Sequence, residues 1–104
     1  MSAHPRLDEA AFNRLLGLSY WGQISEVLAA VDLDSTLATR AGRGGETLLH
    51  HACMGQHLEL VSALLERGAD ATTLNDNGKN ARSFVTSQLL LTRLDQKTKN
   101  SNSY

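Results

Sequence analysis

A repeat with a period of 33 residues is the feature that most constrains the fold of this 104-residue chain. A shift of 33 positions places Trp21-Gly22-Gln23 on Met54-Gly55-Gln56 and, one period later, Gly45 on Gly78. Repeats of this length are supersecondary units that each bury an apolar face against the next unit. The period therefore predicts helical pairs stacked in series.

The middle unit carries the clearest helical pattern. Thr47 can cap a short helix that runs through Met54, because its hydroxyl can accept a backbone N–H. A second helix is expected from about Leu58 to Arg67, and Gly68 follows it, where a helix end favours a left-handed residue. One apolar stripe runs along this second helix: Leu60, Val61, Leu64 and Leu65.

Two motifs of this unit resemble the ankyrin repeat. Thr47-Leu48-Leu49-His50-His51-Ala52 matches the family opening T-P-L-H-x-A, with Leu48 in place of the proline. Residues 64–70 read Leu-Leu-Glu-Arg-Gly-Ala-Asp and match the family pattern Leu-Leu-x-x-Gly-Ala-Asp. The resemblance implies an all-α helical solenoid of about two and a half to three helix-turn-helix units with projecting turn fingers. It also implies that His50 bonds to turn backbone.

We expect an ankyrin-repeat domain over residues 8–94, with units of about 8–41, 42–74 and 75–94. Residues 1–7 and 95–104 are expected to be disordered. The last unit is expected to end in one longer closing helix, because apolar residues continue through Leu89 to Leu91 and Leu94.

So short an array should be marginally stable, because arrays of this kind usually need three or more units to bury a continuous core. Three explanations remain open. In the first, the chain is part of a longer polypeptide. In the second, it gains stability by docking to a partner. In the third, the closing helix and three aromatic residues cap the ends of the array: Phe12, Trp21 and Phe84.

The resemblance also implies where a partner binds, because first helices and turn fingers line the concave side of such arrays. Seven residues there are candidates for protein binding: Trp21, Arg43, Glu46, Met54, Asp76, Asn77 and Lys79. Trp21 and Met54 are equivalent in the repeat and form a candidate apolar anchor. In the alternative, Trp21 covers the end of the core and the charged tips are only solvated loop residues.

Signals for catalysis or metal binding are weak. One cluster offers side chains that bind zinc: His50, His51, Cys53 and His57. Its spacing does not suit one site, because adjacent helical residues diverge and Gly55 breaks the helix. Cys53 reads as a small buried residue, and Gly42-Arg43-Gly44-Gly45 lacks the Lys-Ser/Thr ending of a phosphate loop. We expect no enzyme, no metal and no cofactor.

The net charge of the chain disfavours two classes of partner. A net charge of −1, from 10 basic and 11 acidic side chains, attracts neither nucleic acid nor anionic lipid. The chain shows no signal peptide or membrane-spanning run, and one cysteine suits a reducing compartment, so we expect an intracellular protein, cytoplasmic or nuclear. The predicted function is non-catalytic binding of another protein by an adaptor, inhibitor or regulatory subunit. The alternative is a structural or self-assembling segment, such as a weak homo-oligomer.

Overall fold

The computed structural model describes residues 8–86 and 91–92. These residues form no strand, and Leu91 and Thr92 are helical, so the all-α prediction is confirmed. Within residues 8–86 seven elements follow one another: α1 (Glu9–Tyr20), α2 (Ile24–Leu33), η1 (Ser35–Ala38), η2 (Arg43–Gly45), α3 (Leu48–Met54), α4 (Leu58–Glu66) and η3 (Ala81–Phe84), where η marks a 3₁₀ helix.

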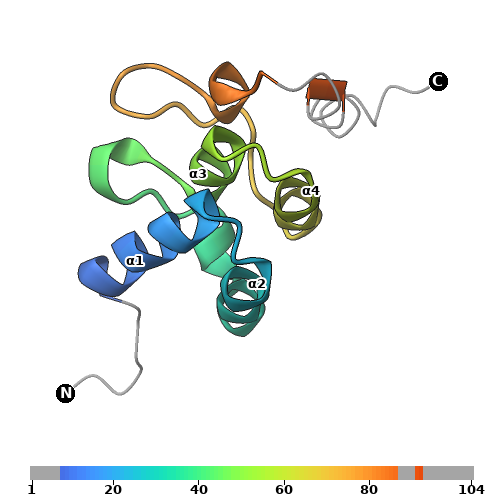
Figure 1. The fold of residues 1–104 in the computed structure, drawn as a ribbon. Coiled ribbons are helices and arrows are strands. Elements are labelled where there is room, and N and C mark those ends of the chain that lie inside the picture. Colours follow the sequence, from blue (N-terminus) through green and yellow to red (C-terminus); the bar gives the residue numbers. More distant parts are fainter. Residues whose placement is uncertain (1–7, 87–90, 93–104) are drawn as a thin grey trace.

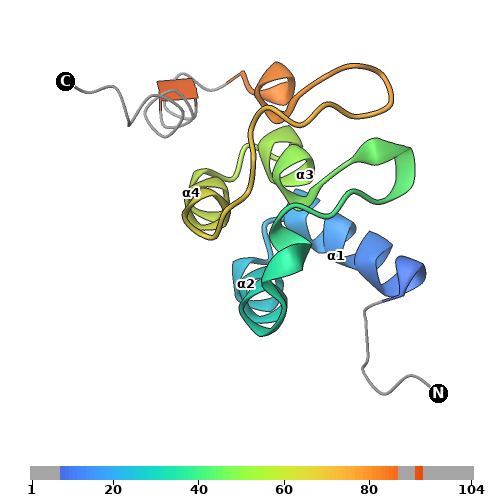
Figure 2. The same ribbon diagram turned by 180° about the vertical axis from the view of Figure 1, so that it is seen from behind.

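The elements are arranged in two layers (Figure 1). The inner layer stacks α1, α3 and η3 in that order, and α3 contacts both of its neighbours. The outer layer consists of α2 and α4, which pack on α1 and α3 and on each other. Seen from behind, the loops before α3 and before η3 project together from the side opposite the outer layer (Figure 2). The predicted helical solenoid with projecting fingers is confirmed.

Helix ends lie where the sequence predicts them. The Asp8 carboxylate accepts the Ala11 N–H at 2.9 Å and caps α1. Thr47 caps α3 in a capping box, in which its hydroxyl accepts the His50 N–H and the His50 ring accepts the Thr47 N–H. Gly68 follows α4 with φ of 100°, the left-handed conformation that ends a helix.

The core runs through the interfaces between the layers. It contains the residues of the predicted stripe on α4, of which Leu65 is only partly buried. Phe12, in the first turn of α1, is fully buried, and the Arg40 guanidinium lies 4.6 Å from the centre of its ring. Leu91 packs on the core, while the rest of the expected closing helix, Leu89, Leu90 and Leu94, lies outside the described residues.

Trp21 does not cover the end of the core, so this alternative is wrong. Its side chain is 71% exposed and lies edge-on to Tyr20, with ring centres 5.2 Å apart. The side chain leaves the core because Trp21 is the C-cap of α1, where the chain turns toward Gly22 with φ of 76°.

Polar side chains connect successive units at the turn between α3 and α4. The His57 ring lies 2.7 Å from the Tyr20 carbonyl oxygen of the preceding unit. On the other side, the Gln56 amide donates to the Phe84 carbonyl at 2.8 Å and accepts the Thr86 N–H at 3.1 Å. The turn between α3 and α4 is therefore hydrogen-bonded to the segments on both sides of it.

Candidate functional site

A groove of about 410 Å³ lies where the first projecting loop meets the inner helices. Only inner helices and a loop line it, so it belongs to the side on which the sequence places partner binding. Its walls come from three segments: Asn13, Leu16 and Gly17 of α1, Arg43, Gly44 and Glu46 of the loop, and His51 and Met54 of α3.

The loop that forms one wall has a fixed shape. Gly44 and Gly45 adopt φ of 70° and 74°, and a Cβ on Gly45 would collide with Asp76. The Gly42 N–H donates to the Glu46 carbonyl at 2.8 Å and closes the loop. The Asp76 N–H donates to the Gly44 carbonyl at 2.9 Å, so the first loop rests on the second.

Asn75 organises the contact between the two loops. Its side chain is buried, and its amide donates to Glu46 Oε2 at 3.0 Å. Its Oδ1 accepts the N–H groups of Asn77 and Lys79 at 2.9 and 3.0 Å. One buried amide thus fixes the Glu46 carboxylate and the turn of the second loop at the same time.

His50 ties the second loop to α3. Its ring accepts the Thr47 N–H at 3.1 Å through Nδ1, and its Nε2 lies 3.1 Å from the Lys79 carbonyl oxygen. The side chain is fully buried. The structural role that the resemblance implies for His50 is confirmed.

Two polar atoms of groove residues are shielded from solvent without a hydrogen-bond partner: Glu46 Oε1 and His51 Nδ1. Burial lowers the pKa of His51, the Glu46 carboxylate partly offsets this lowering, and His50 adds to it. The lowered pKa keeps His51 neutral at pH 7. Glu46 is therefore the negative group of the groove, and Arg43 is its exposed positive group.

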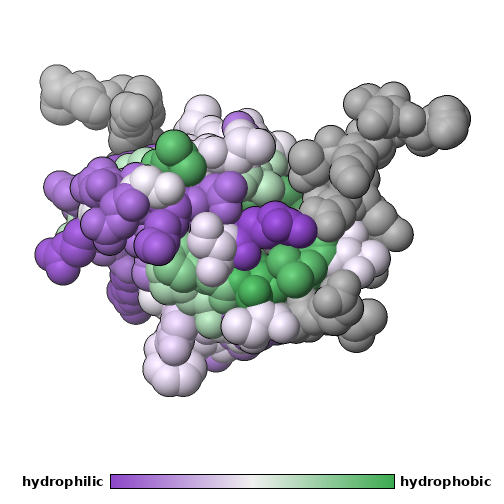
Figure 3. All heavy atoms as spheres, turned by 90° about the horizontal axis from the view of Figure 1, so that it is seen from above, coloured by the Kyte–Doolittle hydropathy of each residue, from purple (hydrophilic) through white to green (hydrophobic). Residues whose placement is uncertain are grey.

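The groove brings together three of the seven predicted residues: Arg43, Glu46 and Met54. Three further polar candidates, Asp76, Asn77 and Lys79, are exposed on the neighbouring loop. Viewed from above, hydrophilic residues gather on the side of the projecting loops, and an apolar patch lies on the other side (Figure 3). Trp21 does not line the groove, so the structure does not combine it with Met54 in one site.

Besides Gly44 of the projecting loop, four lining residues are not among the predicted candidates: Asn13, Leu16, Gly17 and His51. The first three have the spacing i, i+3 and i+4, which places them on one face of α1 and could have revealed that face. The sequence pattern offers His51 only as a possible metal ligand. In the described part of the chain, no three His, Cys, Asp or Glu side chains are grouped as metal ligands.

Cys53 lies in the core rather than in the groove. Its side chain is fully buried, and burial raises the pKa of its thiol to about 12. A thiol in this environment stays protonated and is a poor nucleophile.

Among the described residues, none of the helices is long and apolar enough to span a membrane.

Three curated relatives resemble part of this chain, and all are named 26S proteasome non-ATPase regulatory subunit 10. The human protein is 36% identical over 61 residues, which cover 59% of this chain and 27% of the relative. The mouse protein is 34% identical over 64 residues, or 62% of this chain and 28% of the relative. The rat protein is 36% identical over 61 residues, or 59% of this chain and 26% of the relative. The chain thus matches about a quarter of the length of these relatives.

A family model described as "Ankyrin repeat" matches residues 44–73, inside the second of the expected units. The match includes the Thr47 capping box, the buried His50 and the left-handed Gly68, which the structure shows in the positions that the motifs predict. Residues 44–73 therefore match an ankyrin repeat, and the stacked helical pairs and projecting loops around them have the arrangement of an ankyrin-repeat solenoid.

Proposed function

We propose that the chain is a non-catalytic module that binds another protein through its concave side, as an adaptor, inhibitor or regulatory subunit. The observation that carries this proposal is the groove between α1, the first projecting loop and α3. An apolar side chain, Met54, lines it together with a carboxylate and a guanidinium, Glu46 and Arg43. Such a mixture of apolar and charged groups in one hollow suits a protein surface.

The fixed loop geometry supports binding by a preformed surface. The hydrogen bonds of Asn75 and His50 hold both loops in the free protein. Ordering these loops upon association would cost conformational entropy, and a loop that is already fixed avoids most of this cost. We therefore infer that the groove binds its partner without a large rearrangement.

A regulatory role is supported by the names of the relatives, which are regulatory subunits of a large assembly. The similarity covers about a quarter of those proteins, so it supports a class of role and no particular partner. A non-catalytic role is supported by the protonated, buried Cys53. We propose an intracellular location on the same similarity.

Affinity capture with matched variants tests the proposal. The intact chain, a Met54→Ala variant and a Leu33→Ala variant would be immobilised and exposed to lysate of the source cell. Leu33 is 90% exposed on the outer helix α2 and does not line the groove, so its variant removes a surface leucine outside the proposed site. We expect one protein to be retained by the wild type and by Leu33→Ala and lost with Met54→Ala.

The test also separates the proposal from self-assembly. Circular dichroism would show that all three proteins are folded. Retention of the same proteins by all three chains would contradict binding at the groove. A mass in light scattering that rises with concentration, with nothing captured, would favour a self-assembling segment instead.

A further inference from the structure

We propose that the groove binds a glutamate side chain of the partner protein, whose carboxylate accepts from Arg43 and Asn13 and whose methylene groups cover Gly17 and Met54. This inference rests on the proposed function and specifies the chemistry of the group that binds. It follows from which polar atoms of the groove a ligand can reach, and from the open helix surface that lines the same groove.

Two side chains that line the groove offer donors that are reachable and unpaired. The Arg43 side chain is exposed and forms no hydrogen bond or ion pair with a described residue. The Asn13 side chain is half-buried, and its Nδ2 amide donates to no described residue and is not among the polar atoms shielded from solvent. Both side chains therefore keep donors for a ligand.

The two side chains start from positions that contact each other. The Arg43 N–H donates to Asn13 Oδ1 at 3.3 Å and joins the first projecting loop to α1. Because this bond requires an acceptor, it determines which end of the amide is the oxygen, and the Nδ2 end remains as a donor. A carboxylate has two oxygens, so it can accept from the amide and the guanidinium together.

The acceptor atoms of Glu46 and His51 are out of a ligand's reach. Glu46 Oε2 accepts the Asn75 amide at 3.0 Å, and Glu46 Oε1 is shielded from solvent. His51 Nδ1 is shielded as well, and the lowered pKa of His51 keeps this ring neutral at pH 7. The charge that a ligand in the groove contacts is thus the Arg43 guanidinium, which attracts a carboxylate. The Glu46 charge opposes this attraction without touching the ligand.

The methylene groups of a glutamate have a surface to cover. Gly17 and Met54 line the groove and are partly exposed. A Cβ placed on Gly17 would meet no atom within 4 Å, so the helix surface is open there. The period of 33 aligns Gly17 with His50, whose ring reaches the Lys79 carbonyl oxygen of the next loop. The first unit has no side chain at this position, which leaves room that the second unit lacks.

This open surface favours glutamate over aspartate. Glutamate carries one more methylene group between its carboxylate and its backbone. Burial of a methylene group against an apolar surface strengthens binding about two- to four-fold. The longer side chain also lets the partner's backbone stay outside the groove while the carboxylate reaches Arg43 and Asn13.

Nuclear magnetic resonance titration of the intact chain, at pH 7 and constant ionic strength, tests this inference with defined probes. The probes are the N-acetyl, N′-methylamide derivatives of glutamate, glutamine, aspartate and lysine. We expect saturable shifts at Gly17 and at the Asn13 side-chain amide with the glutamate probe, at a millimolar dissociation constant. Glutamine has the same shape without the charge and should bind about ten-fold more weakly.

Four variants sharpen the result. Arg43→Gln should weaken binding of the glutamate probe about ten-fold, whereas Arg14→Gln, which removes an exposed arginine of α1 outside the groove, should leave it unchanged. Asn13→Asp keeps an acceptor for the Arg43 N–H but replaces the amide donor by a negative charge, so it should abolish binding. Glu46→Gln, which keeps an acceptor for Asn75, should tighten it.

Other outcomes would overturn the glutamate assignment. Equal binding of glutamate and glutamine would show that charge plays no part, and equal weakening by Arg43→Gln and Arg14→Gln would show only a general effect of net charge. Stronger binding of the lysine probe, or no saturable shift at all, would also overturn it. The comparison of glutamate with glutamine uses the wild type, so it holds even if a variant is unstable.

This test fails separately from the test of the proposed function. If the glutamate probe does not bind and Met54→Ala still loses the captured protein, only the glutamate inference has failed. If that capture fails too, so has the proposed function.

Discussion

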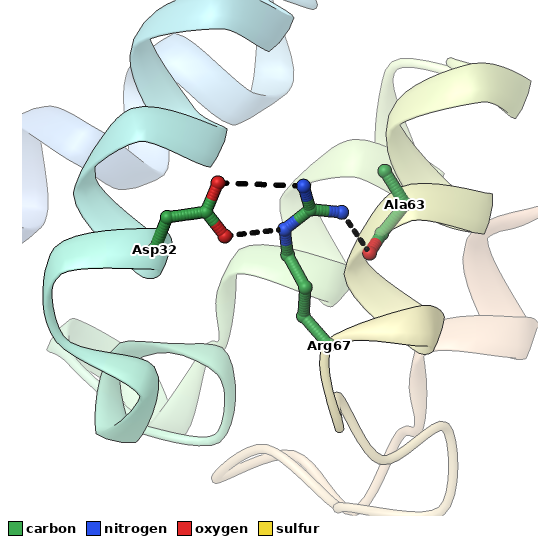
Figure 4. A network of polar contacts seen from close by, with 3 residues as sticks. All are labelled: Asp32, Ala63 and Arg67. Carbon is green, nitrogen blue, oxygen red and sulfur yellow. Dashed lines mark hydrogen bonds and ion pairs between the residues drawn. The ribbon is translucent and has the colours of Figure 1, made fainter.

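Asp32 and Arg67 join the two outer helices near their C-terminal ends through an ion pair with an Nε to Oδ1 distance of 2.8 Å (Figure 4). A longer second contact of 3.4 Å runs from the guanidinium to Oδ2, and the same side chain donates to the Ala63 carbonyl within α4. The Arg67 guanidinium thus binds Asp32 of α2 while a hydrogen bond to the backbone of its own helix, α4, holds it in position.

This ion pair predicts a small stability effect that depends on pH. The Arg67 hydrogen bond lowers the pKa of Asp32, so the folded state favours the carboxylate more than the unfolded state does. The contribution is present at neutral pH and is lost as the pH falls through the pKa of Asp32 in the folded chain, below its usual 3.8. Asp32→Asn should therefore lower the Tm slightly at pH 7 and hardly at all at acidic pH.

Thermal melts of Asp32→Asn and wild type at low and high salt check this effect. Because both side chains face solvent, salt should reduce the difference. A Tm difference that persists in high salt or at low pH would show that Asp32 acts through packing rather than through its charge.

His50 should be far more sensitive to substitution than its neighbour His51. His50→Ala removes the acceptor of the Thr47 N–H and the partner of the Lys79 carbonyl from a fully buried site. We expect a loss of about 2–4 kcal/mol in the free energy of unfolding, from the unpaired groups and the cavity together. Urea denaturation measures it, and His51→Ala, at a partly exposed position, serves as the matched control with a smaller loss.

Substitution of glycine by alanine should have opposite effects on stability at two positions. Gly17→Ala, in the interior of α1 with open space around a new Cβ, should stabilise the chain by about 0.5–1 kcal/mol. Gly55→Ala should destabilise it, because the new Cβ would collide with the Tyr20 carbonyl and the His57 ring. Urea midpoints for both variants check the pair, and stabilisation by Gly55→Ala would contradict the close packing of this turn.

Cys53 should be inert in the native protein. Burial raises the pKa of the thiol to about 12, and its side chain has no exposed surface. We expect no reaction with Ellman's reagent at pH 8 on the time scale of free thiols, and full reaction once urea unfolds the chain. A fast reaction in the native state would reveal opening between α3 and the rest of the core.

The sequence predicts the fold well because the relevant signals are local or strictly periodic. Thr47, His50 and Gly68 act within one unit, and their capping and turn chemistry is expressed in neighbouring residues. The period of 33 then determines which elements are equivalent, and equivalent elements stack.

The candidate site was predicted only in part because its contacts break the period. Asn75 meets Glu46 across 29 positions, so a shift of 33 does not align this pair. Trp21 and Met54 are aligned by the period, and Gly-Gln follows each of them. Their side chains still lie in different surroundings, because Trp21 is the C-cap that follows α1 whereas Met54 is the last residue of α3. A period identifies equivalent backbone positions, whereas the side-chain contacts depend on which residues each unit carries at those positions.

The contact between the two projecting loops means that the groove depends on residues of two neighbouring repeats. Asp76 and Asn75 belong to the third unit, yet they support Gly44 and Glu46 at the edge of the groove in front of them. A chimaera that keeps residues 1–74 and continues with a foreign repeat would retain every residue that lines the groove and still present it with a different outline. The shape of the groove therefore depends on the contact between two neighbouring repeats, which must be inherited together. Recombination between these repeats would change that shape even where every lining residue stays the same.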